Sequence, residues 1–153
     1  IATGERIHTL QEFMMLVNRK ALRYLRADVI LCGGITGLKK IAVLAEANDL
    51  LIVPHNPCSP ICTAASVHVD ASTAAFAIQE YPNDSRMRTQ PGTGEKFPLN
   101  EIVTDTIKCD RGYLIVPDAP GLGIDLVDDA EKKFPYDQYP IRMRTGVDGG
   151  FVG

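Results

Sequence analysis

The sequence predicts an α/β protein built around a parallel β-sheet. Short apolar segments alternate with segments of helical periodicity over about the first 80 residues, the pattern of consecutive βα units. Residues 50–53 are apolar throughout, as in strands that are buried on both faces of a parallel sheet. The length of 153 residues corresponds to about one domain.

The first βα units begin near the start of the chain. Residues 1–6 look like the end of a strand that runs into a loop. Thr9 and Glu12 form a capping box, which predicts a helix from residue 10. Apolar residues follow at helical spacing, namely Leu10, Phe13, Met14, Val17 and Ala21. The next strand is expected over residues 24–30.

Two further helices and two further strands follow. Gly33 and Gly34 break the chain, and Thr36 is the expected N-cap of a second helix that ends at Asn48. Its apolar face consists of Leu38, Ile41, Ala42 and Ala45. After the strand at residues 50–53, Ser59 and Pro60 are the cap and first residue of a third helix. Residues 75–79 form the next predicted strand.

The remainder of the chain has a different character. Residues 81–100 are polar and rich in proline, glycine and arginine, which predicts a long loop. Residues 102–107 fit a helix or a strand equally well. A strand over 112–116, a turn at 120–123 and a short helix over 128–134 complete the predicted elements.

Composition and charge exclude several classes of protein. With 45% apolar and 23% charged residues, the chain is an ordinary globular one. Its net charge of −3 and lack of a basic block argue against a nucleic-acid partner. No apolar run approaches the length of a membrane span. The four cysteines form no C-x-x-C pair, which favours reduced thiols in a cytoplasmic protein. These cysteines are Cys32, Cys58, Cys62 and Cys109.

Polar side chains follow four of the predicted strands. Glu5, Asp28, His55 and Glu80 are separated by 23, 27 and 25 residues, about one βα unit each. In a barrel of parallel strands such residues converge on the face that carries the chemistry. Each also has a structural explanation, because carboxylates often cap helices and a loop histidine is often structural.

Three other features are weaker candidates. His8 and His68 are expected to be packing or surface residues. Residues 33–37 could bind an anion at a helix N-terminus, but they lack the G-x-G-x-x-G order of a dinucleotide site. Cys58 and Cys62 have no further zinc ligands nearby in the sequence and are interpreted as packing residues.

Together these segments resemble the C-terminal half of an enolase-superfamily barrel of the mandelate racemase branch. The resemblance covers about residues 1–125 and is greatest to acid-sugar dehydratases of the galactonate dehydratase type. The matching pieces are Ala2-Thr3-Gly4-Glu5-Arg6, Arg26-Ala27-Asp28, Gly33-Gly34-Ile35-Thr36, Pro54-His55-Asn56-Pro57, Ile78-Gln79-Glu80 and Pro117-Asp118-Ala119-Pro120-Gly121-Leu122-Gly123.

The resemblance implies a role for each candidate residue. Glu5 matches a carboxylate ligand of an essential Mg²⁺, the only implied cofactor. His55 matches the catalytic histidine and Asp28 its hydrogen-bonded partner. Glu80 matches an acid that, when protonated, donates a hydrogen bond to the enolate. Arg6, together with His55 and Glu80, is expected to bind the small sugar-acid substrate.

The resemblance also implies an architecture. Residues 1–90 are expected to form the last βα units of a TIM-type barrel, and residues 91–153 a long loop and an extension that returns to an α+β capping domain. The earlier half of the barrel, that capping domain, two further metal ligands and a second acid–base residue are expected upstream of this chain. The whole enzyme is expected to be a homo-oligomer, and the isolated chain to be inactive.

The implied reaction is a dehydration. Removal of the proton α to a carboxylate gives an enediolate, the 3-hydroxyl leaves as water, and the product is a 2-keto-3-deoxy acid. A racemase, epimerase or cycloisomerase on the same scaffold is the first alternative, since it shares the proton abstraction. A non-catalytic fragment that acts as a binding or assembly module is an alternative of another class.

Overall fold

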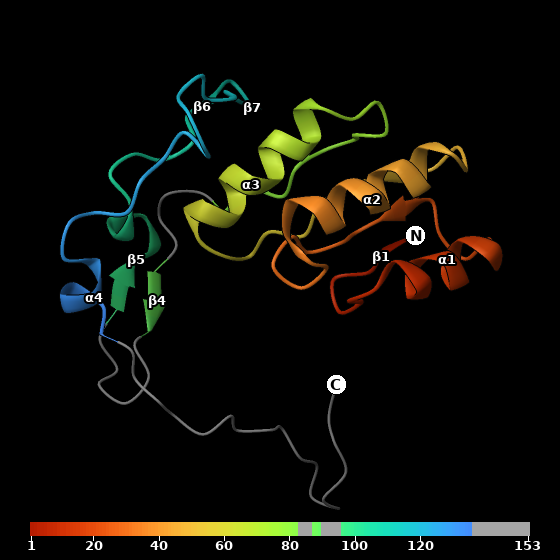
Figure 1. The fold of residues 1–153 in the computed structure, drawn as a ribbon, viewed down its shortest axis with the longest axis horizontal. Coiled ribbons are helices and arrows are strands. Elements are labelled where there is room, and N and C mark those ends of the chain that lie inside the picture. Colours follow the sequence, from red (N-terminus) through yellow and green to blue (C-terminus); the bar gives the residue numbers. More distant parts are fainter. Residues whose placement is uncertain (83–86, 90–95, 136–153) are drawn as a thin grey trace, which may run out of the picture.

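A computed structural model describes residues 1–82, 87–89 and 96–135 of the chain. It shows three parallel βα units followed by short antiparallel pairs (Figure 1). Within this described part, no helix combines the length and the apolar character needed to cross a membrane.

The sheet consists of β1 (Ala2–Thr3), β2 (Tyr24–Leu25) and β3 (Leu51–Ile52), in that order. All pairings are parallel, and both residues of each strand pair with both residues of the next. Because sequential parallel strands are joined by right-handed crossovers, their helices lie on one face of the sheet. The parallel sheet of consecutive βα units predicted from the sequence is therefore confirmed.

Three helices cover that face, α1 (Leu10–Asn18), α2 (Gly34–Glu46) and α3 (Pro60–Ala71), and α2 lies between the other two (Figure 1). The predicted capping box is present at α1. The Thr9 hydroxyl accepts the Glu12 backbone N–H at 3.3 Å, and the Glu12 carboxylate accepts the Thr9 backbone N–H at 2.9 Å.

The start of α2 differs from the expectation that Thr36 is its N-cap. The cap is Gly33, whose φ of 97° belongs to the left-handed region that glycine adopts without strain. Gly33 therefore lets the chain turn into the helix earlier, and Thr36 lies inside it. Glycine is also required at position 37, for a different reason: a Cβ there would overlap the Cys32 carbonyl oxygen.

The core lies between the sheet and the three helices. Its largest fully buried hydrophobic side chains come from two strands and two helices. They are Phe13, Leu25, Leu38, Ile41 and Ile52. Burial of each such side chain contributes roughly 1.5–3 kcal/mol, so this layer holds the helices against the sheet.

The strands are shorter than predicted, most clearly the second and the fourth. The second strand ends at Leu25, and an isolated parallel bridge between Asp28 and His55 continues the pairing. The strand predicted over residues 75–79 is reduced to one bridge between Phe76 and Ile52. That segment pairs with β3 alone in the described part of the chain, so it lacks the second neighbour of a central strand.

After residue 82, the described residues form only short local elements. Within the loop predicted over residues 81–100, two strands pair in an antiparallel way. The predicted strand over residues 112–116 exists as one half of another short pair, and the predicted short helix is present. The elements are β4 (Met87–Thr89), β5 (Lys96–Pro98), η1 (Leu99–Ile102), β6 (Cys109–Asp110), β7 (Tyr113–Leu114) and α4 (Ala130–Lys133).

A second, smaller core attaches this segment to α3. Ala64 and Val67 of α3 are buried together with Ile107. Partly buried residues of the later segment pack against them, namely Leu114, Leu122 and Ile124. The undecided stretch at 102–107 is neither a regular helix nor a strand, since Val103 makes only an isolated bridge with Leu126.

Candidate active site

The four residues predicted at strand ends follow successive strands at one edge of the sheet. Glu5 follows β1, Asp28 follows β2, His55 follows β3, and Glu80 follows the bridge at Phe76. Because the strands are parallel, these carboxyl-terminal ends lie at the same edge. The structure thus brings together groups that lie far apart in sequence.

Asp28 and His55 form a hydrogen-bonded pair, as the sequence predicted. The His55 Nδ1 atom lies 2.9 Å from Asp28 Oδ2, and the two side chains are 19% and 5% exposed. A carboxylate only accepts hydrogen bonds, so Nδ1 carries the proton and Nε2 is left to accept another. The other Asp28 oxygen accepts the Ile30 N–H at 2.8 Å, which holds the carboxylate in place.

Backbone pairing explains why this pair is well positioned. The His55 N–H donates to the Ala27 carbonyl at 2.9 Å, and the bridge places Asp28 directly beside His55. Pro54 and Pro57 flank the histidine segment and restrict its backbone. The imidazole is therefore held by rigid strand ends.

Glu80 forms a second cluster beside this pair. Its Oε2 atom accepts a hydrogen bond from Arg26 Nη2 at 2.6 Å and one from the Asn56 N–H at 2.9 Å. The Asn56 side chain is fully buried and donates to the Glu80 carbonyl at 3.0 Å and to Thr63 Oγ1 at 2.7 Å. Asn56 therefore ties the ends of two neighbouring strands to α3.

The charge state of Glu80 differs from the protonated acid that was expected. Partial burial by itself raises the pKa of Glu80, but the Asn56 N–H and the Arg26 guanidinium outweigh it, so the pKa is lowered overall. Glu80 is therefore an ionised acceptor in this structure. The group that carries donors at this position is Arg26.

Glu5 is a partly exposed carboxylate at the end of β1. A hydrogen bond from its own backbone N–H is the largest cause and lowers the pKa of Glu5; burial opposes it, and the nearby charge of Arg26 adds a smaller lowering, so the pKa is lowered overall. The carboxylate is therefore ionised at neutral pH. Arg6, the adjacent residue, is exposed and makes no ion pair within the described residues.

Glu5 has the chemistry of a metal ligand but does not form a complete site. Mg²⁺ prefers carboxylate oxygens and commonly uses one or two of them together with water and substrate oxygens. Across residues 1–82, 87–89 and 96–135, no group of three or more Asp, Glu, His or Cys side chains gathers closely enough to hold a metal ion. The donor type fits the ion, and the described residues supply only one of the oxygens expected.

No role was predicted from the sequence for Arg26 or Asn56. Arg26 lies two residues before Asp28, so an extended chain places both side chains on one face. That spacing was visible in the sequence. The contribution of Asn56 was not, because it depends on backbone and side-chain hydrogen bonds to residues 7 and 24 positions away.

Comparisons with known proteins agree with this geometry. Residues 1–130 match the family model described as enolase C-terminal domain-like. A D-galactonate dehydratase family member of Musicola paradisiaca is 36% identical over 141 residues, which are 90% of this chain and 31% of that protein. A D-mannonate dehydratase of Caulobacter vibrioides is 34% identical over 151 residues, 97% of this chain and 35% of that protein.

Solved structures show the same fold. An enolase from Agrobacterium radiobacter, bound to sodium and L-malate, superposes with a TM-score of 0.81 at 31% identity over 98% of this chain and 39% of its own. An enolase from Pantoea ananatis with bound D-gluconate and magnesium superposes with a TM-score of 0.74 at 36% identity, over 90% of this chain and 31% of its own. The chain spans about a third of the length of the curated relatives. The family match and the parallel βα units show that the chain belongs to the enolase C-terminal domain-like family, a TIM-barrel-type fold.

Proposed function

We propose that this chain is part of a Mg²⁺-dependent sugar-acid dehydratase. The observation that carries the proposal is the hydrogen-bonded pair of His55 and Asp28 at the edge where the ionised Glu5 also lies. Membership of the enolase C-terminal domain-like family and the dehydratase names of the relatives support the reaction class. The substrate is a sugar acid that carries a hydroxyl at C3.

His55 is the proposed acid–base group. With its proton on Nδ1, the imidazole presents Nε2 to the substrate and can take the proton at C2 or return one to the departing 3-hydroxyl. Asp28 keeps the ring in this tautomer and stabilises the imidazolium that forms when Nε2 is protonated. Loss of water then leaves an enol that ketonises to the 2-keto-3-deoxy acid.

Glu5 is proposed to hold Mg²⁺ together with ligands from outside the described residues. A bound Mg²⁺ would neutralise part of the negative charge that develops on the substrate carboxylate when the α proton leaves. Glu5 suits this task because it is ionised and partly exposed at the same edge as His55. His55 is not a proposed ligand, so the metal and the base are separate groups.

Glu80 and Arg26 are proposed to orient the substrate. One Glu80 oxygen is bound by Arg26 and Asn56, which leaves Oε1 to accept a hydrogen bond from a sugar hydroxyl. Arg26 carries a delocalised positive charge near the carboxylates of Glu80 and Glu5, and its guanidinium can also donate a hydrogen bond to a substrate oxygen. Arg6 is also a proposed substrate contact, because it is exposed next to Glu5.

The domain arrangement is also a proposal. Residues 1–90 are assigned to the barrel and 91–153 to an extension. All the parallel pairing within the described part of the chain involves residues before 77, whereas later pairings are antiparallel. The small core at Ile107, which packs against α3, supports this assignment.

A chimera tests the proposed function. This chain replaces the matching segment of the Pantoea ananatis enolase, and dehydration of D-gluconate and D-mannonate is measured with Mg²⁺ present. We expect turnover in the chimera and a loss of at least about 100-fold in His55→Asn, since general acid–base catalysis contributes roughly 10²–10⁴-fold.

His68→Asn is the matched control. His68 lies on α3 and contacts the Leu122 carbonyl at 3.3 Å, away from the strand ends, so the same substitution there should leave turnover nearly unchanged. Circular dichroism confirms that both variants fold. If folded His55→Asn retains full turnover, the role proposed for the pair is wrong.

A further inference from the structure

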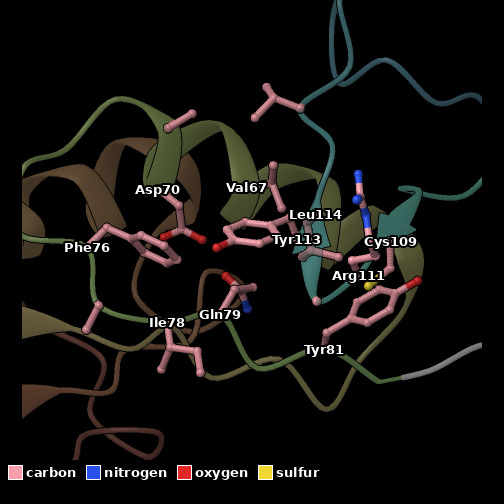
Figure 2. Close-up of a pocket in the computed structure, with 14 residues that line it drawn as sticks. Val67, Asp70, Phe76, Ile78, Gln79, Tyr81, Cys109, Arg111, Tyr113 and Leu114 are labelled. Carbon is pink, nitrogen blue, oxygen red and sulfur yellow. The ribbon is translucent and has the colours of Figure 1, made fainter.

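A large cavity lies beside the Phe76 segment. It is lined by α3, by residues 76–81 and by the hairpin of β6 and β7, and its volume is about 720 Å³. Figure 2 shows three aromatic side chains around it, Phe76 and Tyr81 from residues 76–81 and Tyr113 from β7. A volume of roughly 300–1,000 Å³ with mostly apolar walls is typical of a site for an organic molecule.

Two buried acceptors line this cavity without donors. Asp70 of α3 is only 8% exposed, points into the cavity in Figure 2, and neither of its carboxylate oxygens has a hydrogen-bond partner. The side-chain oxygen of Gln79 is buried on the same cavity and also lacks a partner. Buried polar groups are nearly always hydrogen-bonded, so two unpaired acceptors on one cavity indicate a missing donor.

Two basic side chains lie close to this part of the fold and are engaged elsewhere. Arg111 lines the cavity, but its guanidinium pairs with Asp110 at 3.3 Å and is largely exposed. Lys39 reaches the end of α3, where it donates to the Ser72 carbonyl and hydroxyl. Neither side chain donates a hydrogen bond to the Asp70 carboxylate.

We propose that this cavity binds an organic cation, an ammonium or guanidinium group on an apolar body. Such a group supplies several N–H donors for Asp70 and Gln79, and its charge compensates the buried carboxylate. The aromatic walls formed by Phe76, Tyr81 and Tyr113 suit both the apolar body and the cation. The same chemistry is carried by a free amine and by a lysine or arginine side chain of a polypeptide.

The experiment titrates the chain with 2-phenylethylammonium chloride by calorimetry, with 2-phenylethanol as the uncharged control of the same shape. Burial raises the pKa of Asp70 to about 7, so the titration is done at about pH 8, where the carboxylate is ionised. Methyl NMR signals of Val67 and Leu114, which line the cavity, report where the probe binds. A capped tripeptide with a central lysine between two leucines is the second probe.

Two variants decide the outcome. Asp70→Asn keeps the side-chain shape and should weaken binding of the cation at least about tenfold, since losing one partner of a buried charge pair is costly. Asp110→Asn removes the same charge from the exposed rim and should change the affinity less than about twofold. Tighter binding of the tripeptide assigns the site to a polypeptide side chain, and tighter binding of the amine assigns it to a small molecule.

Three results would overturn the proposal. The first is no saturable binding of either cationic probe. The second is equal affinity for the ammonium and the alcohol, which would mean that the cavity selects only apolar shape. The third is an equal loss in Asp70→Asn and Asp110→Asn, or NMR shifts that spare Val67 and Leu114.

Discussion

Replacing Asp28 with asparagine is expected to lower the free energy of unfolding of the chain by about 0.5–2 kcal/mol. The carboxylate is 5% exposed and makes two hydrogen bonds, to the Ile30 N–H at 2.8 Å and to His55 Nδ1 at 2.9 Å. Asparagine keeps an oxygen for Ile30. At His55 it can offer only its amide, so a hydrogen bond to a charged acceptor, worth about 1.5–3 kcal/mol, becomes a neutral one of about 1 kcal/mol.

Urea unfolding followed by circular dichroism measures this loss. Asp110→Asn is the matched control, because its exposed pair with Arg111 should contribute less than about 0.5 kcal/mol. A double-mutant cycle with His55→Asn isolates the pair, and most of the Asp28→Asn loss should disappear in the His55→Asn background. An undiminished loss in that background, or no loss at all, would refute the reasoning.

Three further predictions concern packing, charge and metal. Gly37→Ala should cost about 2–3 kcal/mol in urea unfolding because its Cβ meets the Cys32 carbonyl oxygen, whereas Gly112→Ala, with positive φ but open space, should cost about 1 kcal/mol. Burial raises the pKa of Asp70 from 3.8 to about 7, so the folded chain retains a proton that the unfolded chain releases. This retained proton stabilises the folded chain by on the order of 4 kcal/mol; the stabilisation is complete below about pH 4 and is lost as the pH rises through 7. In Asp70→Asn, the free energy of unfolding measured from pH 4 to 8 should lose this dependence on pH. The chain alone should bind Mg²⁺ weakly and dehydrate no sugar acid, because the described residues form no cluster of three ligands; a tight single site in a calorimetric titration would contradict this.

Sequence periodicity was sufficient to predict the order of the elements, and the spacing together with the family resemblance predicted the pairing of Asp28 with His55. The two residues lie one βα unit apart, and parallel pairing alone brings them side by side. Sequence periodicity did not predict the length of each strand. Residues 75–79 have the composition of a strand, but they pair with β3 through Phe76 alone.

Other features depend on contacts that no local pattern reveals. Thr36 is a good cap by residue type, yet Gly33 turns the chain into the helix earlier through its left-handed φ of 97°, and Gly37 lies closer to the Cys32 carbonyl than a residue with a Cβ could. Glu80 was expected to be protonated because its likeness to the family suggested a donor. Its ionised state follows from Arg26 and Asn56, which reach it across 54 and 24 residues of sequence.

The most direct test of the central claim separates the base from the metal ligand. In the chimera with the Pantoea ananatis enolase, turnover and Mg²⁺ affinity are measured for His55→Asn and for Glu5→Gln. His55→Asn should lose at least about 100-fold in turnover while its Mg²⁺ affinity stays within about twofold, because His55 moves a proton and binds no metal. Glu5→Gln should weaken Mg²⁺ binding by at least about tenfold, since it removes a charged ligand. Equal loss of Mg²⁺ affinity in the two variants would contradict the assignment of His55 as the base and Glu5 as the ligand.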